Sequence, residues 1–163
     1  MQIKKLHHHA VRCRNSEDTR KFYEDFLGMP LVHAIKIDET KTGRKTQTLH
    51  TFFRLGDGSH LAFFEAPDRP FEFKKQHDFD LHTALEVDQD TFNEIRVRAK
   101  NLGMEVRGIS DHEIIHSIYL RDPNGYVVEL CVKTTEHDSI LEKGATHAKT
   151  LLAEWSKREN HTG

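Results

Sequence analysis

Two stretches of this chain resemble one another, and each begins with a histidine in a segment of strand-forming residues. The first runs from His9 through a helical stretch to Leu27–Met29, and the second runs from His82 to Leu102–Met104. Self-similarity over this length indicates two copies of one supersecondary unit that pack together. A chain of 163 residues is long enough for one domain, or for two half-domains that share a core.

Both halves show the same order of predicted elements: a strand, a helix and three strands. Hairpin turns are predicted at Gly56-Asp57-Gly58 and at Asp122–Gly125, where glycine and proline suit tight turns. The sequence therefore predicts an α+β fold made of two βαβββ modules, about 6–66 and 80–133, within a domain of residues 1–135. Residues 136–163 form a tail with an amphipathic helix near 138–158, which is expected to pack on the domain or on a second subunit.

Several local features set the predicted boundaries of these elements. Ser16 or Asn15 is expected to cap the first helix, and Gly28 is expected to end it. The second helix is predicted over 90–101, with Phe92, Ile95 and Val97 among its apolar residues. A strand is predicted at 104–108. Residues 67–79, rich in proline, phenylalanine and charge, are expected to link the two halves.

The composition narrows the classes of partner. The net charge of −2 gives no strong field for nucleic acid or anionic lipid, and no apolar run is long enough to span a bilayer. The chain lacks a signal-peptide core, and its two cysteines, Cys13 and Cys131, fit buried structural thiols in a reducing cytoplasm. We expect a cytoplasmic protein that binds a small molecule, with neither nucleic acid nor membrane as a partner.

The repeat identifies three candidate metal ligands. His9 and His82 begin the two copies. When the hairpin glycines Gly58 and Gly125 are aligned, Glu129 in the second copy corresponds to Ala62 in the first. Two imidazoles and one carboxylate are typical of non-haem Fe(II) sites, and the same donors bind Mn, Co, Ni or Zn.

Each candidate also has an ordinary structural reading. A histidine on a strand is commonly a core or surface residue, and strand alternation alone does not direct both histidines inward. Glu129 is harder to explain in this way, because it interrupts the apolar strand Tyr126–Val132 and a buried carboxylate requires a cation or a hydrogen-bonding partner.

Residues 6–133 resemble the vicinal oxygen chelate superfamily, which includes glyoxalase I, bleomycin-resistance proteins, fosfomycin-resistance thiol transferases and extradiol ring-cleaving dioxygenases. The matching segments are His8-His9-Ala-Val-Arg-Cys, Arg20–Met29, His82–Val87 and Asp122–Leu130. The resemblance implies that the two modules curl into an open, incomplete barrel around a divalent metal held by His9, His82 and Glu129. Ala62 departs from the four-ligand pattern of glyoxalase I.

The segment 112–129 is more specifically similar to the extradiol dioxygenases: a histidine, a tyrosine, Asp-Pro-x-Gly and then Glu129. This resemblance implies that His112 acts as acid and base and that Tyr119 donates a hydrogen bond to the bound substrate. His116 is the alternative to His112. Ser110 departs from the residues usual at its position, and no match is found for a further active-site histidine of that family.

These observations predict an Fe(II)-dependent dioxygenase that cleaves a catechol-like ring. A non-oxidative lyase, isomerase or thiol transferase with another divalent metal is the first alternative, and a small-molecule binding or resistance protein is the second. Phe52, Phe53, Phe63 and Phe64 are candidates for an aromatic pocket wall, with hydrophobic core as the default interpretation. A homodimer is expected, because a small pair of modules has open sheet edges to cover.

Overall fold

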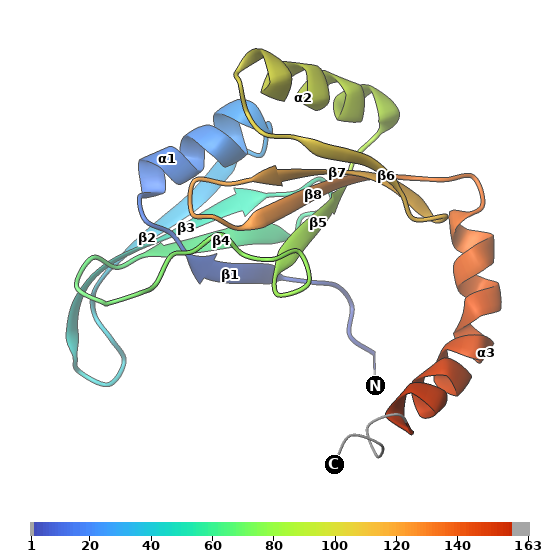
Figure 1. The fold of residues 1–163 in the computed structure, drawn as a ribbon. Helices are drawn as coiled ribbons and strands as arrows, with labels where there is room; N and C mark the ends of the chain where they lie inside the picture. The colour runs from blue at the N-terminus through green and yellow to red at the C-terminus, as the bar shows by residue number, and fades with distance from the viewer. Residues whose placement is uncertain (1, 158–163) are drawn as a thin grey trace. The chain divides into compact units, whose positions relative to one another are not determined.

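The structure of the chain is a computed structural model that describes residues 2–157 (Figure 1). The chain divides into two compact units. The first contains the chain up to Thr83 together with Leu120–Val128, and the second contains Ala84–Tyr119 together with the chain from Glu129 onward. The hairpin tip of the second predicted module, around Asp122, therefore belongs to the first unit.

The first unit is built on a four-stranded sheet with the order β1-β4-β3-β2. Its strands are β1 (His8–Arg12), β2 (Leu31–Glu39), β3 (Lys45–Arg54) and β4 (His60–Glu65). β1 runs parallel to β4, and the other neighbours are antiparallel. The predicted hairpin between β3 and β4 is present: the Leu55 amide donates to the Ser59 carbonyl at 2.9 Å, and Gly58 adopts a φ of +78°.

The first helix begins as predicted and then widens. Asn15 caps α1 (Ser16–Arg20), because its side chain accepts from the Asp18 amide at 2.9 Å. The helix continues as a π-helical segment, η1 (Lys21–Phe26), in which the Leu27 amide donates to the Phe22 carbonyl. Gly28 follows with a φ of +78°, the conformation that ends many helices.

The core of the first unit lies between this helix and one face of the sheet. Phe53 and Phe63 are buried there, and both rings contact Tyr23, with centroids 5.8 and 4.7 Å away. Phe52 and Phe64 lie on the opposite face of the sheet, since neighbouring residues of a strand alternate between faces. Of the four candidate pocket phenylalanines, Phe53 and Phe63 are therefore core residues.

A hydrogen-bond network joins the predicted turn at Asp122–Gly125 to the first helix. The Asp122 carboxylate accepts from the Tyr23 hydroxyl at 3.1 Å and from the amides of Asn124 and Tyr126. Burial raises the pKa of the Asp122 carboxyl and holds the pKa of Tyr23 well above its usual range. This network explains why the hairpin tip belongs to the first unit.

The second sheet has the order β5-β8-β7-β6. Its strands are β5 (His82–Glu86), β6 (Arg107–Asp111), β7 (Ile115–Arg121) and β8 (Val127–Lys133). β6 begins three residues later than the predicted strand at 104–108, because the Met104 amide still donates to the Ala99 carbonyl at the end of the preceding helix.

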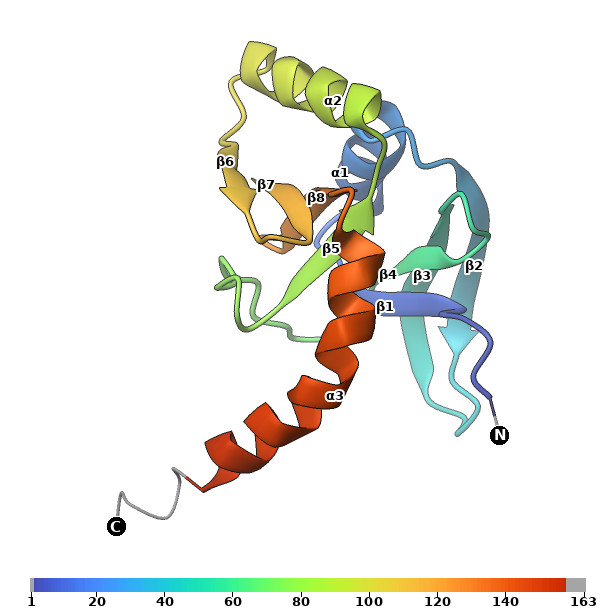
Figure 2. The ribbon, with the colours of Figure 1, turned by 90° about the vertical axis from the view of Figure 1, so that its right-hand side faces the viewer.

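That helix, α2 (Gln89–Asn101), is capped by Asp88, whose carboxylate accepts from the Thr91 amide. Of the apolar residues predicted in this helix, Phe92 and Ile95 are buried, whereas Val97 is 60% exposed. The last helix, α3 (His137–Ser156), follows β8 in the chain and has no buried residue (Figure 2).

The predicted α+β fold of two βαβββ modules and a C-terminal helix is confirmed. Within residues 2–157 neither sheet closes into a barrel, as the prediction of an incomplete barrel requires. Cys13 and Cys131 are both buried free thiols, and burial raises the pKa of each. In the same part of the chain, no helix combines the length and apolarity needed to cross a membrane.

Candidate functional site

The second unit brings three of the predicted functional residues together. Ser117 and Tyr119 lie on the same face of β7, two residues apart, and both point toward Glu129 on β8. The Ser117 hydroxyl donates to Glu129 Oε1 at 2.5 Å, and the Tyr119 hydroxyl donates to the same oxygen at 3.3 Å. Glu129 is only 4% exposed. The strand therefore holds a buried carboxylate in a fixed orientation.

His112 extends this arrangement to the surface. Its Nε2 lies 2.8 Å from the Tyr119 hydroxyl. A phenol has one hydrogen, so when Tyr119 donates to Glu129 the imidazole donates to the phenol oxygen. The guanidinium of Arg107 lies 5.3 Å from the centre of the Tyr119 ring and covers one of its faces. His112, Tyr119 and Glu129 thus form a continuous hydrogen-bonded chain, from here on the carboxylate relay.

His116, the alternative to His112, lies outside the carboxylate relay. It alternates with Ser117 on β7 and so points to the other face of the strand. Its Nε2 lies 3.7 Å from the carboxylate of Asp111, its partner residue on β6. The structure thus associates His112, and not His116, with Glu129.

In the first unit, His9 lies on the face of β1 that packs toward the helix. It borders a narrow cavity of about 10 Å³, which is room for about one water molecule. The residues around this cavity are His9, Val11, Tyr23, Leu61, Phe63, Leu81, Thr83 and Tyr126. His9 is therefore surrounded mainly by apolar and aromatic side chains.

The same cavity shows the direction of His82. Leu81 and Thr83 border it, and a strand directs consecutive side chains to opposite sides, so His82 points away from the cavity that contains His9. His82 Nδ1 lies 2.6 Å from the Asp78 carbonyl oxygen, which can only accept. Nδ1 must carry the proton, and the lone pair of the neutral ring is on Nε2. Metal-binding histidines commonly show this arrangement.

His8, the neighbour of His9, lies on the other face of β1. It pairs in register with His60 on β4, and its ring lies 5.8 Å from Phe52 and 6.4 Å from His50. Ala62 lies on this face as well, because it pairs with Ala10 and is fully buried. His8 and His82 thus both point away from the cavity around His9.

Sequence reasoning missed the ring-rich surface around His8. His50 is buried, donates from Nδ1 to the Phe63 carbonyl at 3.0 Å, and stacks on Phe64 with centroids 3.6 Å apart. Burial lowers its pKa. His33 lies 5.8 Å from Phe52. The alternating patterns His50-x-Phe52 and His60-x-Ala62-x-Phe64 could have indicated one shared face, once β3 and β4 were paired.

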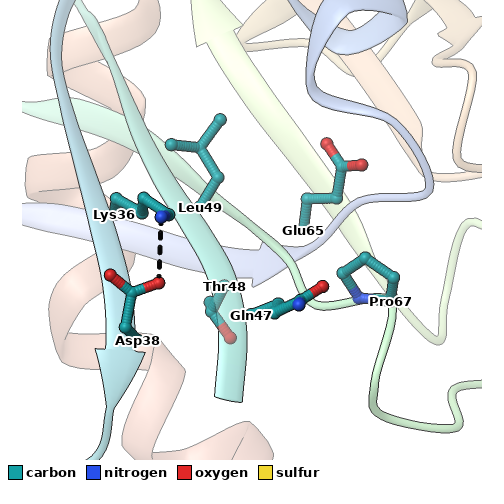
Figure 3. Close-up of a pocket in the computed structure, with 7 residues that line it drawn as sticks. All are labelled: Lys36, Asp38, Gln47, Thr48, Leu49, Glu65 and Pro67. Atoms are coloured by element: carbon teal, nitrogen blue, oxygen red, sulfur yellow. Dashed lines mark ion pairs between the residues drawn. The ribbon is translucent and has the colours of Figure 1, made fainter.

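A separate, open cavity of about 390 Å³ lies over β2, β3 and β4 of the first unit (Figure 3). It is bordered by Lys36, Asp38, Gln47, Thr48, Leu49, Glu65 and Pro67. Lys36 and Asp38 form an ion pair of 3.1 Å between well-exposed side chains. None of the predicted site residues borders this cavity.

Comparison with known proteins identifies one family. Residues 5–130 match the model of the Glyoxalase/Bleomycin resistance protein/Dioxygenase superfamily.

Across residues 2–157, no three His, Cys, Asp or Glu side chains are grouped closely enough to hold a metal ion.

Three solved structures illustrate the likeness in fold. A glyoxylase/bleomycin resistance protein/dioxygenase domain from Frankia sp. EAN1pec is 12% identical, with a TM-score of 0.65 over 82% of this chain and 100% of that one. The fosfomycin resistance protein FosX from Listeria monocytogenes, complexed with Mn(II) and sulfate, is 20% identical, with a TM-score of 0.61 over 84% and 98%. The oxidase ChaP-H2 is 18% identical, with a TM-score of 0.61 over 82% and 96%.

Proposed function

Because the chain belongs to the Glyoxalase/Bleomycin resistance protein/Dioxygenase superfamily, we propose that it is a metal-dependent enzyme that acts on a small molecule, most specifically an Fe(II)-dependent extradiol-type dioxygenase. The observation that carries the proposal is the carboxylate relay of His112, Tyr119 and Glu129. The carboxylate relay connects the buried carboxylate of Glu129, a type of group that commonly binds metals, to the exposed imidazole of His112, a type of group that transfers protons. A catechol-like ring is the substrate that this combination suits.

We assign the metal to His82, Glu129 and one histidine of β1. The sequence favoured His9, but the structure favours His8 in this role. His9 borders a cavity with room for about one water molecule, and His82 points away from it, as His8 does.

The chemistry of these donors, two imidazoles and a carboxylate, suits a divalent metal, although within residues 2–157 they are not grouped closely enough to hold one. His82 has its lone pair on Nε2, and Glu129 has one oxygen held by Ser117. When bound, Fe(II) would bind the two vicinal oxygens of a catechol and favour their ionised form.

The side chains of the carboxylate relay have separate tasks in this proposal. His112 takes the proton of a catechol hydroxyl at Nδ1, the nitrogen that carries the lone pair when Nε2–H donates to Tyr119. Tyr119 donates a hydrogen bond to the ionised substrate oxygen, and its present bond to Glu129 keeps the hydroxyl close to the carboxylate. Ser117 fixes Glu129 so that the carboxylate does not rotate.

The surface around His8 supports an aromatic substrate. Phe52 and Phe64 are partly exposed on the face of the sheet that carries His8, and the stack of His50 on Phe64 shows that planar rings pack well there. Aromatic rings bind to one another in offset or edge-to-face arrangements. We therefore propose Phe52 and Phe64 as contacts for the ring of the substrate.

A non-oxidative lyase, isomerase or thiol transferase is the second candidate. The observation in its favour is the similarity in fold to FosX, whose structure contains Mn(II). Two imidazoles and a carboxylate bind Mn(II) as well as Fe(II), so the ligands alone do not choose between the two reactions.

Oxygen consumption distinguishes these candidates. Protein loaded with Fe(II) without oxygen is mixed with oxygenated buffer and a panel of substituted catechols, while an electrode records oxygen and absorbance records a yellow ring-opened product. We expect uptake with colour, reduced by about 10²–10⁴-fold in His112→Phe and unchanged in the matched control His116→Phe. No uptake by protein that holds stoichiometric iron would refute the dioxygenase proposal.

A further inference from the structure

Three basic side chains form a row across the sheet of the first unit. Arg54 on β3 pairs in register with His60 on β4, and His60 pairs in register with His8 on β1. Directly paired residues place their side chains on the same face of a sheet, about 5 Å apart. The ring of Phe52 lies 6.2 Å from that of His60 and 5.8 Å from that of His8. The row therefore borders the surface that we assign to the ring of the substrate.

This face of the sheet carries no acidic side chain beside the row. Neither aspartate nor glutamate occurs in the strand stretches that form it, which are 8–12, 33–37, 48–54 and 60–64. The acidic residue closest in sequence to the row is Asp57, in the turn between β3 and β4. Its carboxylate accepts from the amide and the hydroxyl of Ser59, at 2.8 and 2.6 Å. A negative group that lies on these strand stretches therefore meets positive and neutral side chains.

Arg54 is the cation of the row that is available to a ligand. Its side chain is exposed, and within residues 2–157 its guanidinium forms neither an ion pair nor a hydrogen bond. Arg12, on the same face, is already engaged, because it donates to the carbonyl oxygens of Ala66 and Arg69 at 2.9 and 3.1 Å. A guanidinium stays charged in proteins and binds a carboxylate through two parallel hydrogen bonds.

We propose that the substrate of this site is an aromatic acid whose carboxylate binds Arg54 while its ring lies against Phe52. The inference rests on the proposed function, which places the vicinal oxygens of the ring toward His8. Arg54 and His8 are two strand spacings apart, or about 9.6 Å between their backbones. Because the arginine side chain is long and flexible, it can reach a carboxylate on the side of the ring that faces away from His8. A positively charged substituent at that place would be repelled.

Two ligands of nearly the same shape and different charge test the proposal. The full chain with Mn(II) is equilibrated by dialysis against 3,4-dihydroxybenzoate or 3,4-dihydroxybenzamide, and the bound ligand is measured by absorbance. We expect the acid to bind about tenfold more tightly than the amide, and Arg54→Gln to remove this preference by weakening the acid alone. Arg54→Lys should keep part of the preference, because lysine retains the charge without the paired hydrogen bonds. The matched control is Arg44→Gln, in the exposed loop between β2 and β3, which should keep the preference in full.

The results that would overturn the proposal differ from those that would refute the proposed reaction. Equal binding of acid and amide by the wild type, no binding of the acid, or a preference that survives Arg54→Gln would overturn it. Equal weakening of both ligands in Arg54→Gln, shown to be folded by circular dichroism, would overturn it as well. A preference that depends on Arg54 in a protein without oxygen uptake would refute the dioxygenase reaction and support the anion site. Oxygen uptake without any preference for the acid would refute the anion site alone.

Discussion

Removal of one hydroxyl tests the buried end of the carboxylate relay. Ser117→Ala deletes the donor that lies 2.5 Å from Glu129 Oε1, and both residues are buried, Ser117 completely and Glu129 to all but 4%. Water therefore has little access to replace the lost bond. Tyr119 remains as a donor to the same oxygen, but at the longer distance of 3.3 Å.

The expected loss follows from this geometry. A hydrogen bond to a charged group contributes about 1.5–3 kcal/mol, and a buried acceptor that loses a donor costs a similar amount. We expect Ser117→Ala to lower the free energy of unfolding by about 2 kcal/mol. Tyr119→Phe should cost less, because the bond that it removes is longer. A second effect concerns metal, because loss of a group that orients a ligand typically lowers metal affinity about 10–100-fold.

Urea unfolding followed by circular dichroism measures the first effect, and calorimetric titration with Mn(II) measures the second. The matched control is Ser139→Ala, which removes an exposed hydroxyl that donates to the Glu136 carbonyl, and which should change stability by less than about 0.5 kcal/mol. If Ser117→Ala unfolds at the same urea concentration as the wild type, the hydroxyl does not hold Glu129, and the reasoning fails.

Three further substitutions test the fold of the first unit by urea unfolding. Burial raises the pKa of Asp122, so in the folded chain this carboxyl keeps a proton that it releases above about pH 4 in the unfolded chain. The stability advantage of the wild type over Asp122→Asn should therefore shrink as the pH rises through that raised pKa. A stability difference that stays constant with pH would contradict the raised pKa of Asp122. Gly125→Ala should cost about 1–3 kcal/mol, because φ is +96° and the added methyl would collide with the Lys74 carbonyl oxygen; a neutral result would show that the turn relaxes. Phe53→Ala should cost about 3–5 kcal/mol through a core cavity, and a loss below 1 kcal/mol would mean that the core closes around the gap.

The order of elements could be read from the sequence because it depends on local signals. Asn15 and Gly28 mark the ends of the first helical segment through hydrogen bonding and a positive φ, and both effects involve only neighbouring residues. β6 begins later in the chain than predicted, because the Met104 amide still donates to the Ala99 carbonyl at the end of α2. The exposure of Val97 depends on which side of α2 is covered, and the apolar pattern did not distinguish that side.

The residues of the candidate site also divide into those that the sequence indicates by itself and those that depend on how distant segments pack. Glu129 was predicted because a carboxylate in an apolar strand is costly, and Tyr119 and His112 were predicted because their segment resembles the extradiol dioxygenases. The choice between His8 and His9 depends on which face of β1 packs against the helix. A shift of one residue exchanges the two faces, so three adjacent histidines do not reveal it. The contribution of His50 depends on the pairing of β3 with β4, which joins residues distant in sequence.

The most direct test of the proposed metal site is binding of Mn(II) or Co(II) to variants of the two adjacent histidines, measured by titration calorimetry. The assignment predicts that His8→Ala loses binding, as His82→Ala and Glu129→Ala do, whereas His9→Ala keeps it. Far-ultraviolet circular dichroism confirms that each variant is folded. Retained binding in His8→Ala together with lost binding in a folded His9→Ala would contradict the assignment and return the ligand role to His9.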